Sequence, residues 1–467
     1  MTDMKRKEFS EEKMKYLYRI IFITLIVLYF CGHYACSKKP ALPKNIILCI
    51  SDGCGYNCFD AASLYQYGKT GEQVYENFPV KYAVSTYSAD GNKYDPDEAW
   101  RSFDFVKKAP TDSAASATAM ATGVKTYNGA INVDVNKTRL ETVLERAEKL
   151  GKASGVVTTV MFAHATPACF VAHNEERSNF IEIAREMIFE SPVDVIMGCG
   201  HPYYDKKGHP VEKPVFKYVG GEDTWNALLN GNAGGDADGD GISDPWVLIQ
   251  SRAEFQSLVS GPTPKRVIGI PYVYHTLQEE RGGDMNAAPY AVPLIESMPT
   301  LEEMTAAALN ILNEDKDGFF LMIEGGAVDW AGHDMEAGRI IEEQIDFNKT
   351  VEVVVNWVEK HSTWEETLVI VTTDHETGYI YGPGSGVFEP GEEIKTGDVW
   401  KLLVNNGKGN LPGMEWHCSG HTNSLVPLYA RGVCSGKFDL YADEYDPVRG
   451  KYLDNTEIAK LIFSILN

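Results

Sequence analysis

Five groups of carboxylate and imidazole side chains each stand next to an apolar run of this sequence, and we expect metal chemistry from them. Singly, a strand-end aspartate is commonly a helix cap, and an isolated histidine is commonly a hydrogen-bonded core or surface residue. Carboxylates and imidazoles without thiolates suit zinc together with magnesium. So many carboxylates in one place would repel one another unless cations neutralised them. The groups are Asp52; His164 with Thr166; Glu324, Asp329 and His333; Asp374 with His375; and His421.

Ser113 is a candidate nucleophile in a stretch of small residues that runs from Thr111 to Gly123. Alanine is the best helix former, and Ser and Thr interrupt a helix only mildly, so the stretch predicts a helix that packs closely against a sheet. Asp112 and Ser113 would stand at its N-terminus, where unpaired N–H groups and the helix dipole favour anions. The alternative is a capped, buried, alanine-rich helix without chemistry.

Buried strands and amphipathic helices must position these side chains. Continuous apolar runs predict strands at Asn45–Ser51, Ser154–Val160, Val193–Gly198, Gly318–Ile323, Thr367–Thr373 and Ser424–Ala430. Helices are expected at Leu140–Leu150, with a Thr138/Glu141 capping box and Gly151 as its stop, at Leu301–Asn313, with a Thr300/Glu303 box, and at about 335–360. The alternation predicts an α/β fold with a doubly wound, mostly parallel central sheet flanked by helices. Ligands of such sheets bind at the carboxyl ends of the strands, where the five groups would meet.

The composition limits the classes of partner. The formal net charge of −23 argues against a nucleic-acid partner. Affinity for anions must therefore come from bound metals or from arginine. The nine cysteines have irregular spacing and no Cys-x-x-Cys pair, so neither a zinc ribbon nor a disulfide framework is expected.

The N-terminus predicts an exported protein. Lys15 and Arg19 precede an apolar run, Ile20–Phe30, that is short for a bilayer span but fits a signal peptide. Cys36 resembles the lipid-attachment cysteine of bacterial lipoproteins. We therefore expect a signal peptide at 1–36 and a linker at 37–44. The mature protein would be a periplasmic lipoprotein that acylated Cys36 anchors to the membrane. The alternative is an uncut signal anchor, and Met14 is an alternative start. About 430 residues would remain, enough for a large core.

Six motifs, in order, resemble those of the alkaline phosphatase family, and the resemblance covers residues 45–467. They are Ser51-Asp52-Gly53; Asp112-Ser113-Ala114-Ala115-Ser116-Ala117; His164-Ala165-Thr166-Pro167 with Arg177; Glu324, Asp329 and His333; Asp374-His375; and Ser419-Gly420-His421. The nucleophile motif alone is moderately specific, and the six together are highly specific.

The resemblance implies a phosphomonoester hydrolase with two zinc ions and one magnesium ion. Ser113 would take the phosphoryl group, and Arg177 would clamp two phosphate oxygens. One dication would lower the pKa of the serine hydroxyl, and a second would stabilise the leaving alkoxide. Small phosphomonoesters are the expected substrates, and a homodimer is the candidate assembly. The implied ligand sets are Asp329, His333 and His421 for one zinc; Asp52, Asp374 and His375 for the second; and Asp52, Thr166 and Glu324 for the third ion.

Two residues depart from the best-known bacterial pattern. His164 stands where an Asp lies near the third metal, and Trp330 stands where a Lys approaches the phosphate through water. Both are expected beside the substrate. Because imidazole nitrogen is a good zinc ligand, the third site could also take zinc.

Residues from about 200 to 299 lack clean alternation of strands and helices and are expected to form an inserted cap or lobe. Their acidic stretch begins like a calcium loop, but its twelfth position is Val247 in place of the bidentate glutamate. A solvated acidic turn is the alternative to calcium binding. The candidate calcium ligands are Asp236, Asp238, Asp240 and Asp244.

Rival functions come from the same superfamily and from outside it. A sulfatase would need a Cys/Ser-x-Pro-x-Arg motif, which is absent around Ser113. Related phosphodiesterases usually have a threonine nucleophile and lack an arginine at the position of Arg177. A phosphomutase and a non-catalytic metal-binding lipoprotein complete the alternatives. A non-catalytic protein of this kind would be expected to have lost the nucleophile or a metal ligand, and this sequence has a residue of the required type at each of these positions.

Overall fold

The computed structural model describes residues 42–237, 241–387 and 399–466, together with Lys13, Met14, Tyr16 and Arg19. The chain divides into two units, Met1–Ala41 and Leu42–Asn467, and the fold described below is that of the second unit. Apart from those four residues, the expected signal segment with Cys36 lies outside the described residues, as do Asp238 and Asp240 of the candidate calcium loop. In the described part of the chain, no helix is both long and apolar enough to cross a membrane.

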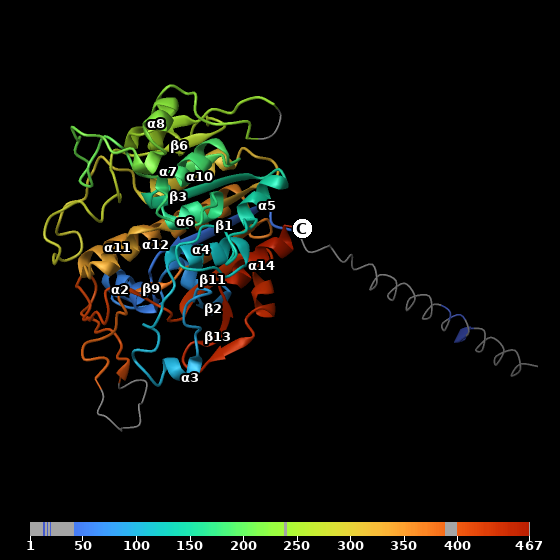
Figure 1. Cartoon of the computed structure of the whole chain (residues 1–467). Coiled ribbons are helices and arrows are strands. Elements are labelled where there is room, and N and C mark those ends of the chain that lie inside the picture. The colour runs from blue at the N-terminus through green and yellow to red at the C-terminus, as the bar shows by residue number, and fades with distance from the viewer. Residues whose placement is uncertain are drawn as a thin grey trace, which may run out of the picture. The chain divides into compact units, whose positions relative to one another are not determined.

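An eleven-stranded sheet forms the centre of this unit (Figure 1). The strands from β8 through β5 pair in parallel, whereas β11 runs antiparallel to both of its neighbours. The mostly parallel sheet predicted from the sequence is thus confirmed. In spatial order the strands are β12 (Glu444–Asp446), β13 (Gly450–Asp454), β2 (Val80–Ser85), β11 (Val426–Gly432), β8 (Thr367–Thr372), β1 (Asn45–Ser51), β7 (Phe319–Gly325), β3 (Ala153–Met161), β4 (Val195–Cys199), β6 (Val267–Gly269) and β5 (Val247–Ile249).

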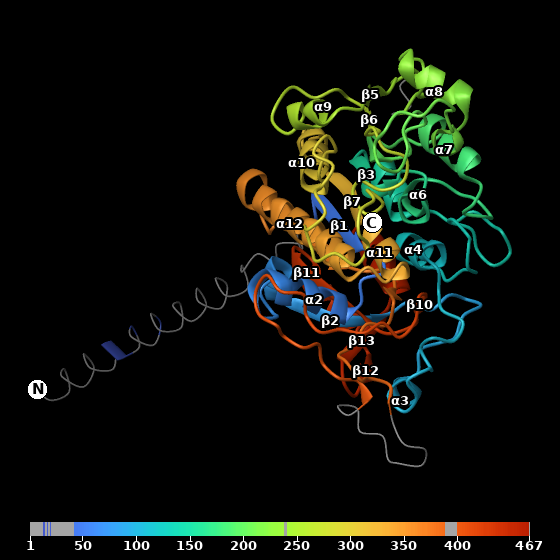
Figure 2. The same cartoon turned by 90° about the vertical axis from the view of Figure 1, so that its left-hand side faces the viewer.

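Helices cover both faces of the sheet (Figure 2), as a doubly wound fold requires. All seven residues of β1 are buried, and Ile46 and Ile47 belong to different core clusters on opposite faces. A strand buried on both faces must be apolar throughout, which explains the continuous runs in the sequence. One core contains α4 (Ser113–Thr122), α5 (Val143–Lys149), α6 (Ala165–Val171), α7 (Phe180–Phe189) and α14 (Thr456–Ile465); the other contains α2 (Tyr56–Tyr67), α9 (Arg252–Ser257), α10 (Leu301–Leu312), α11 (Ala327–His333) and α12 (Ala337–His361).

The two predicted capping boxes had different outcomes. The box of α10 forms as predicted between Thr300 and Glu303. The predicted box of α5 is wrong, because the helix begins at Val143 and its box joins Thr142 to Glu145. Residues 138–140 are instead hydrogen-bonded to 132–134, including Leu140 N to Asn132 O at 2.9 Å, so they cannot turn into a helix.

The segment 200–299, expected as an inserted lobe, contributes β5 and β6 to one edge of the central sheet. Strand β6 pairs in parallel with β4, with Val195 opposite Val267. The segment also contains the short helix α8 (Glu222–Leu229). Further along, the ring of His275 lies 5.6 Å from that of Trp330, which places this part of the segment beside a predicted substrate-binding residue.

Candidate active site

The carboxyl ends of neighbouring parallel strands bring the predicted metal ligands together. Strand β1 lies between β7 and β8, with Ile50 opposite both Glu324 and Thr372. Asp52 therefore leaves the sheet beside Glu324 of β7, and Asp374 follows β8. All three carboxylates are fully buried.

The remaining ligands come from α11 and from a short hairpin. Asp329 and His333 are four residues apart on α11 and therefore share a helix face. His421 belongs to β10 (His421–Thr422), which pairs with β9 (Glu376–Thr377). Nε2 of His333 lies 3.0 Å from Nε2 of His421 and 3.4 Å from Oδ2 of Asp329. The first predicted zinc set is thus gathered in one place.

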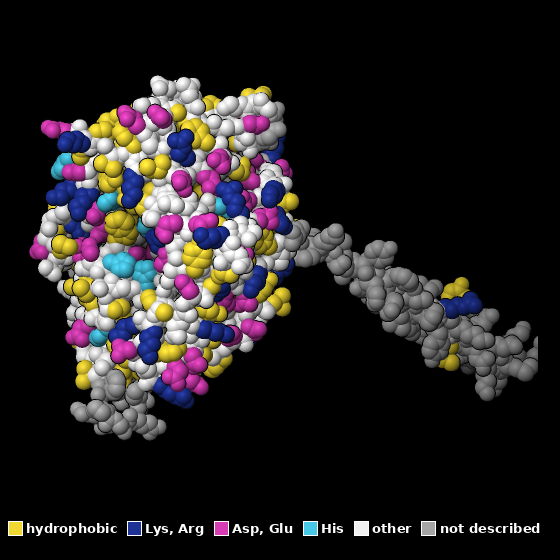
Figure 3. All heavy atoms as spheres, in the orientation of Figure 1, with side chains coloured by type: hydrophobic (Ala, Val, Ile, Leu, Met, Phe, Trp, Pro, Cys, Tyr) yellow, Lys and Arg dark blue, Asp and Glu magenta, His cyan; other side chains and the backbone are white. Residues whose placement is uncertain are grey.

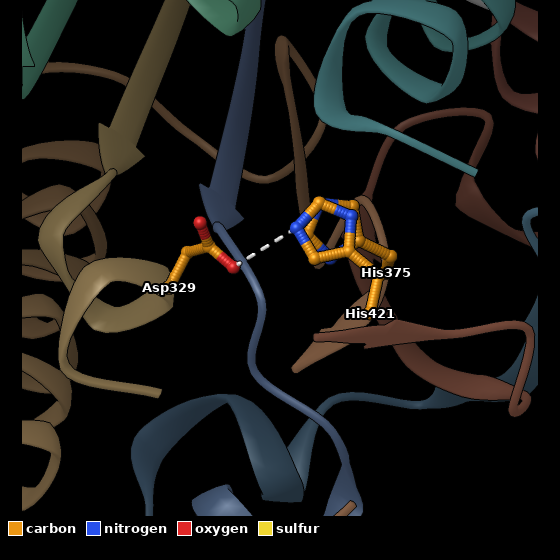
Figure 4. Close-up of side chains that lie close together, drawn as sticks. All are labelled: Asp329, His375 and His421. Atoms are coloured by element: carbon orange, nitrogen blue, oxygen red, sulfur yellow. Dashed lines mark ion pairs between the residues drawn. The ribbon is translucent and has the colours of Figure 1, made fainter. Parts of the chain in front are cut away.

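His375 lies between two groups of candidate ligands. Figure 4 shows Asp329 facing the stacked rings of His375 and His421, whose centroids are 3.6 Å apart. Nε2 of His421 is 3.5 Å from Oδ1 of Asp329. On its other side, Nε2 of His375 is 3.2 Å from Oδ2 of Asp374 and 3.5 Å from Oδ1 of Asp52. His375 thus belongs to two groups of three residues whose ligand atoms lie within 4.8 Å of one another. The first group is Asp329, His375 and His421, and the second is Asp52, Asp374 and His375. The second group is the second predicted zinc set.

The donor atoms fit divalent cations. Both oxygens of Asp52, Oδ2 of Asp374, Oε1 of Glu324 and Oγ1 of Thr166 are buried without a hydrogen-bond partner among the described residues. Burial, followed by the neighbouring carboxylates, raises the pKa of Asp52 well above its usual range. Burial raises the pKa of Asp374 to about 8 and that of Glu324 to about 7. Such groups are costly to bury unless protons or cations neutralise them, and the imidazoles beside them suit zinc.

Hydrogen bonds from neighbouring groups fix the orientation of the ligands. Nδ1 of His333 lies 2.7 Å from Ser419 O, and Nδ1 of His421 lies 2.8 Å from Thr111 O, so each ring presents Nε2 to the cluster. Gly53 N donates to Oδ1 of Asp374 at 3.1 Å.

Two threonines also hold ligand carboxylates. Thr158 donates to Glu324, and Thr377 donates to Asp329. Sequence reasoning did not identify either threonine, since neither stands in a motif that marks such a role.

Gly53 lets the end of β1 pass close to α11. Its φ of +72° favours glycine, and a Cβ there would lie 2.7 Å from Oδ1 of Asp329. The Ser51-Asp52-Gly53 motif therefore combines a ligand with the only residue type that fits beside the neighbouring ligand.

Ser113 is the first residue of α4, as predicted. Asp112 caps the helix by accepting from Ala115 N at 2.8 Å, and Gly123 ends it with a φ of 77°. Ser113 is buried, and its Oγ lies 3.2 Å from Nε2 of His375. The hydroxyl thus adjoins both the helix N-terminus and the second ligand group, where an oxyanion would be favoured.

Arg177 is held beside Ser113 by two neighbours. Its Nη1 donates to Oδ2 of Asp112 at 2.9 Å, and its Nη2 lies 3.2 Å from Nε2 of His164. Burial, followed by the charge of Arg177, lowers the pKa of His164 to about 3, so this imidazole is neutral and can accept from the guanidinium. Sequence reasoning did not identify the link between Arg177 and Asp112.

A pocket of about 360 Å³ opens above these groups. Trp330 forms one wall, with its ring 6.0 Å from that of His164. Figure 3 shows histidine side chains at the surface on this face, near the position of α11 in Figure 1. The lining residues are Ser113, His164, Arg177, Asp329, Trp330, His333, Asp334 and His421.

The described part of the candidate calcium loop lies apart from this pocket. Oδ2 of Asp236 accepts from Gly241 N at 2.8 Å, and Oδ2 of Asp244 accepts from Ala237 N at 3.2 Å. Oδ1 of Asp244 pairs with Lys265 at 2.7 Å. Calcium binding at this loop remains a prediction.

Comparisons with known proteins agree with this geometry. The family model for alkaline phosphatase matches residues 43–413. Alkaline phosphatase 3 of Bacillus subtilis (strain 168) is 30% identical over 91% of this chain and 89% of that protein. Alkaline phosphatase of Escherichia coli (strain K12) is 28% identical over 88% of this chain and 85% of that protein.

Solved structures of the same kind share the fold. The cold-active alkaline phosphatase of the psychrophile Shewanella sp. has 26% identity and a TM-score of 0.62, covering 91% of this chain and 100% of that one. A histidine-to-glutamate variant of TAB5 alkaline phosphatase, with magnesium bound in its M3 site, has 25% identity and a TM-score of 0.61, covering 92% and 99%. The chain belongs to the alkaline phosphatase family and is a phosphatase with a divalent-metal site.

Proposed function

We propose that this protein hydrolyses small phosphomonoesters through a phosphoseryl intermediate on Ser113, at a site holding two zinc ions and one magnesium ion. The observation that supports this best is the position of Ser113 Oγ, 3.2 Å from Nε2 of His375 in the pocket that Arg177 also lines. The buried oxygens of Asp52, Thr166 and Glu324 that have no hydrogen-bond partner among the described residues support magnesium as the third ion, because magnesium prefers oxygen ligands.

The residues of the chain account for both halves of the reaction. Ser113 Oγ attacks phosphorus, its bond to phosphorus forms as the ester P–O bond breaks, and the alcohol leaves. Each terminal nitrogen of Arg177 retains a second N–H, so the guanidinium can bind two phosphate oxygens while Asp112 and His164 hold it. Water then attacks the phosphoserine, and Ser113 departs as its hydroxyl. When bound, the cations would supply a lowered pKa for the attacking hydroxyl and charge neutralisation for the leaving oxygen.

Replacing Ser113 by alanine tests the intermediate. Turnover of p-nitrophenyl phosphate should fall by several orders of magnitude, and acid quenching should trap phosphate on Ser113 in the native protein only. Metal content by elemental analysis is the control, because an intact centre shows that the loss is chemical. Full activity in Ser113→Ala would reject the assignment.

The rival hydrolases are separated by substrate. A phosphomonoesterase should prefer p-nitrophenyl phosphate to bis-p-nitrophenyl phosphate, whereas a phosphodiesterase should show the reverse order. A non-catalytic metal-binding lipoprotein would cleave neither, even with zinc and magnesium present.

We also propose that the protein is exported to the periplasm and anchored there through acylated Cys36. Its mature form should begin at Cys36 and partition into detergent, and Cys36→Ala should release it or block processing. A native protein that is unacylated and begins after residue 36 would contradict this. A homodimer remains the candidate assembly, which the mass of the purified protein in solution would test.

A further inference from the structure

A second group of acidic side chains lies where α11 ends and α12 begins. One oxygen each of Glu279, Asp334 and Glu336 lies within 4.8 Å of the other two. Asp334 follows the ligand His333 directly, Glu336 precedes the first residue of α12, and Glu279 comes from the loop after β6. None of the three belongs to the ligand sets described above.

The backbone holds the three carboxylates from separate directions. Asp334 N donates to Trp330 O at 3.0 Å, and Glu336 N donates to Ala331 O at 2.9 Å, so both are tied to the last turn of α11. The opposite loop is held at Leu277, whose N–H donates to Thr159 O of β3 at 3.0 Å. The group therefore joins two parts of the fold that are distant in sequence.

Glu279 provides an independent indication of a ligand. It is only 4% exposed, and its Oε2 has no hydrogen-bond partner among the described residues. Neither of two neighbouring cationic side chains is paired with Glu279: Lys206 pairs with Glu280 at 3.1 Å, and Arg339 donates to Gly282 O at 2.6 Å and forms an ion pair with Glu336, its Nε lying 3.7 Å from Oε2. A buried carboxylate without a partner beside two other carboxylates is costly unless a cation or a proton neutralises it.

We propose that Glu279, Asp334 and Glu336 bind a divalent cation, and that calcium is the ion that fits them best. The donors are all carboxylate oxygens, without the imidazole or thiolate that favours zinc. Calcium accepts roughly six to eight oxygens in irregular geometry, whereas magnesium demands a near-ideal octahedron. The exposed side of the group at Asp334 leaves an entry path and room for water ligands.

The ion would stabilise the helix that supplies two active-site ligands. It would tie the loop at Glu279 to the C-terminal end of α11, which also contains Asp329 and His333. Asp334 itself lines the substrate pocket. The binding site would thus be separate from the catalytic metals but would hold their supporting helix in place.

A proton is the rival occupant. Burial, followed by the charges of Glu280, Glu336 and Asp334, raises the pKa of Glu279 to about 8. A protonated Glu279 would need no ion and would bind no calcium, which the experiment must separate from the proposal.

Calcium titration calorimetry at pH 8.5 tests the site in the zinc-loaded protein, with and without saturating magnesium. The parent carries Asp238→Asn and Asp240→Asn, so that the acidic loop cannot account for binding. We expect one calcium ion per chain, an affinity at least 10-fold weaker in Glu279→Gln, and an affinity within about threefold of the parent in Glu280→Gln. Glu280 is the matched control because it is adjacent in sequence but pairs with Lys206 and His275.

Thermal unfolding gives a second readout. Calcium at 100 times the Kd of the parent should raise the Tm of the parent by about 3 °C and that of Glu279→Gln by no more than about half as much, because a 10-fold weaker site is then only at about 10 times its own Kd. If Glu279→Gln does not fold, Asp334→Asn at the exposed side should show the same loss of affinity. Equal affinity in these variants, or absence of calcium binding by the parent under both magnesium conditions, would overturn the proposal, and the second result would favour the proton.

Discussion

Trp330 determines the charge of one wall of the substrate pocket. Its indole lies beside the rings of His164 and His275, and it supplies no cation to a bound phosphate. We predict that Trp330→Lys lowers the inhibition constant for inorganic phosphate, because an ammonium group there attracts the dianionic product. Steady-state inhibition of p-nitrophenyl phosphate hydrolysis measures this.

Trp330→Phe separates charge from shape in the same assay. It keeps an aromatic wall without adding a cation, so its phosphate inhibition should stay near that of the native protein. If the lysine and phenylalanine variants change inhibition equally, loss of the indole and not gain of charge is responsible.

His164 is the second residue whose chemistry can be tested alone. Its Nδ1 is buried without a partner among the described residues, and Thr166 and Asp52 nearby have partnerless oxygens as well. A spare nitrogen near an oxygen-rich site favours zinc over magnesium. We predict that zinc-loaded native protein is less active until magnesium is added, and that His164→Asp loses this response. Indifference to magnesium in both proteins would reject this account of the third site.

At the residue scale, the sequence predicted which candidate metal ligands lie together better than it predicted the residues that hold them in place. Asp52, Asp374 and Glu324 were identified because parallel strands end at one edge, and chain order suffices to predict that. Thr158 and Thr377 were not, since their hydrogen bonds to ligand carboxylates depend on the packing of separate strands. Glu279 and Asp334 likewise stand 55 positions apart in the sequence and meet only when the chain between them has folded.

At the scale of elements, α4 shows what a helix of small residues allows. All ten of its residues are buried, and it packs against α6 and α14 while presenting Ser113 to the metal ligands. We predict that Ala117→Leu lowers the free energy of unfolding by about 1–3 kcal/mol, because a fully buried site has no space for a larger side chain. The urea midpoint of metal-loaded protein measures the loss.

Ala253→Leu is the matched control for this helix. Ala253 is exposed in α9, so the same change of side chain there should shift the urea midpoint little. Equal loss at the two positions would show that tight packing of α4 is not the cause.

The sequence predicted long buried elements and was less successful at their ends and at the sheet edges. Strands such as β1 and β8 were identifiable because burial on both faces requires an uninterrupted apolar run. The short strands β5 and β6 were not, since three residues give no periodic signal. The predicted start of α5 was wrong because hydrogen bonds between residues 132–134 and 138–140 hold the chain extended before the helix begins.

At the scale of the whole molecule, the buried carboxylates couple metal binding to stability and pH. In metal-free protein Asp374 has a pKa of about 8 and Glu324 one of about 7, raised first by burial. A carboxyl whose pKa is raised on folding stabilises the fold at low pH, and this contribution is lost as pH rises through the folded-state pKa. The pKa of His333 is raised to about 9, first by its hydrogen bond with Asp329, so its contribution to the free energy of unfolding is lost between pH 6.5 and 9 as well. Burial lowers the pKa values of His375 and His164, so these two residues affect the free energy of unfolding only below about pH 6.5.

We therefore predict that chelator-treated protein unfolds at progressively lower urea concentration as pH rises from 6.5 to 8.5. One fully displaced proton corresponds to about 1.4 kcal/mol per pH unit. Zinc- and magnesium-loaded protein should show a smaller decline or a rise, because the cations bind the deprotonated groups. Burial also raises the pKa values of Glu148 and Glu279, which are not among the predicted zinc ligands. Asp374→Asn therefore measures the contribution of the metal site alone. In metal-free protein it should reduce the decline of the urea midpoint with pH. A metal-free midpoint that rises with pH would contradict the coupling, since it would mean that the unfolded chain binds more protons than the folded one.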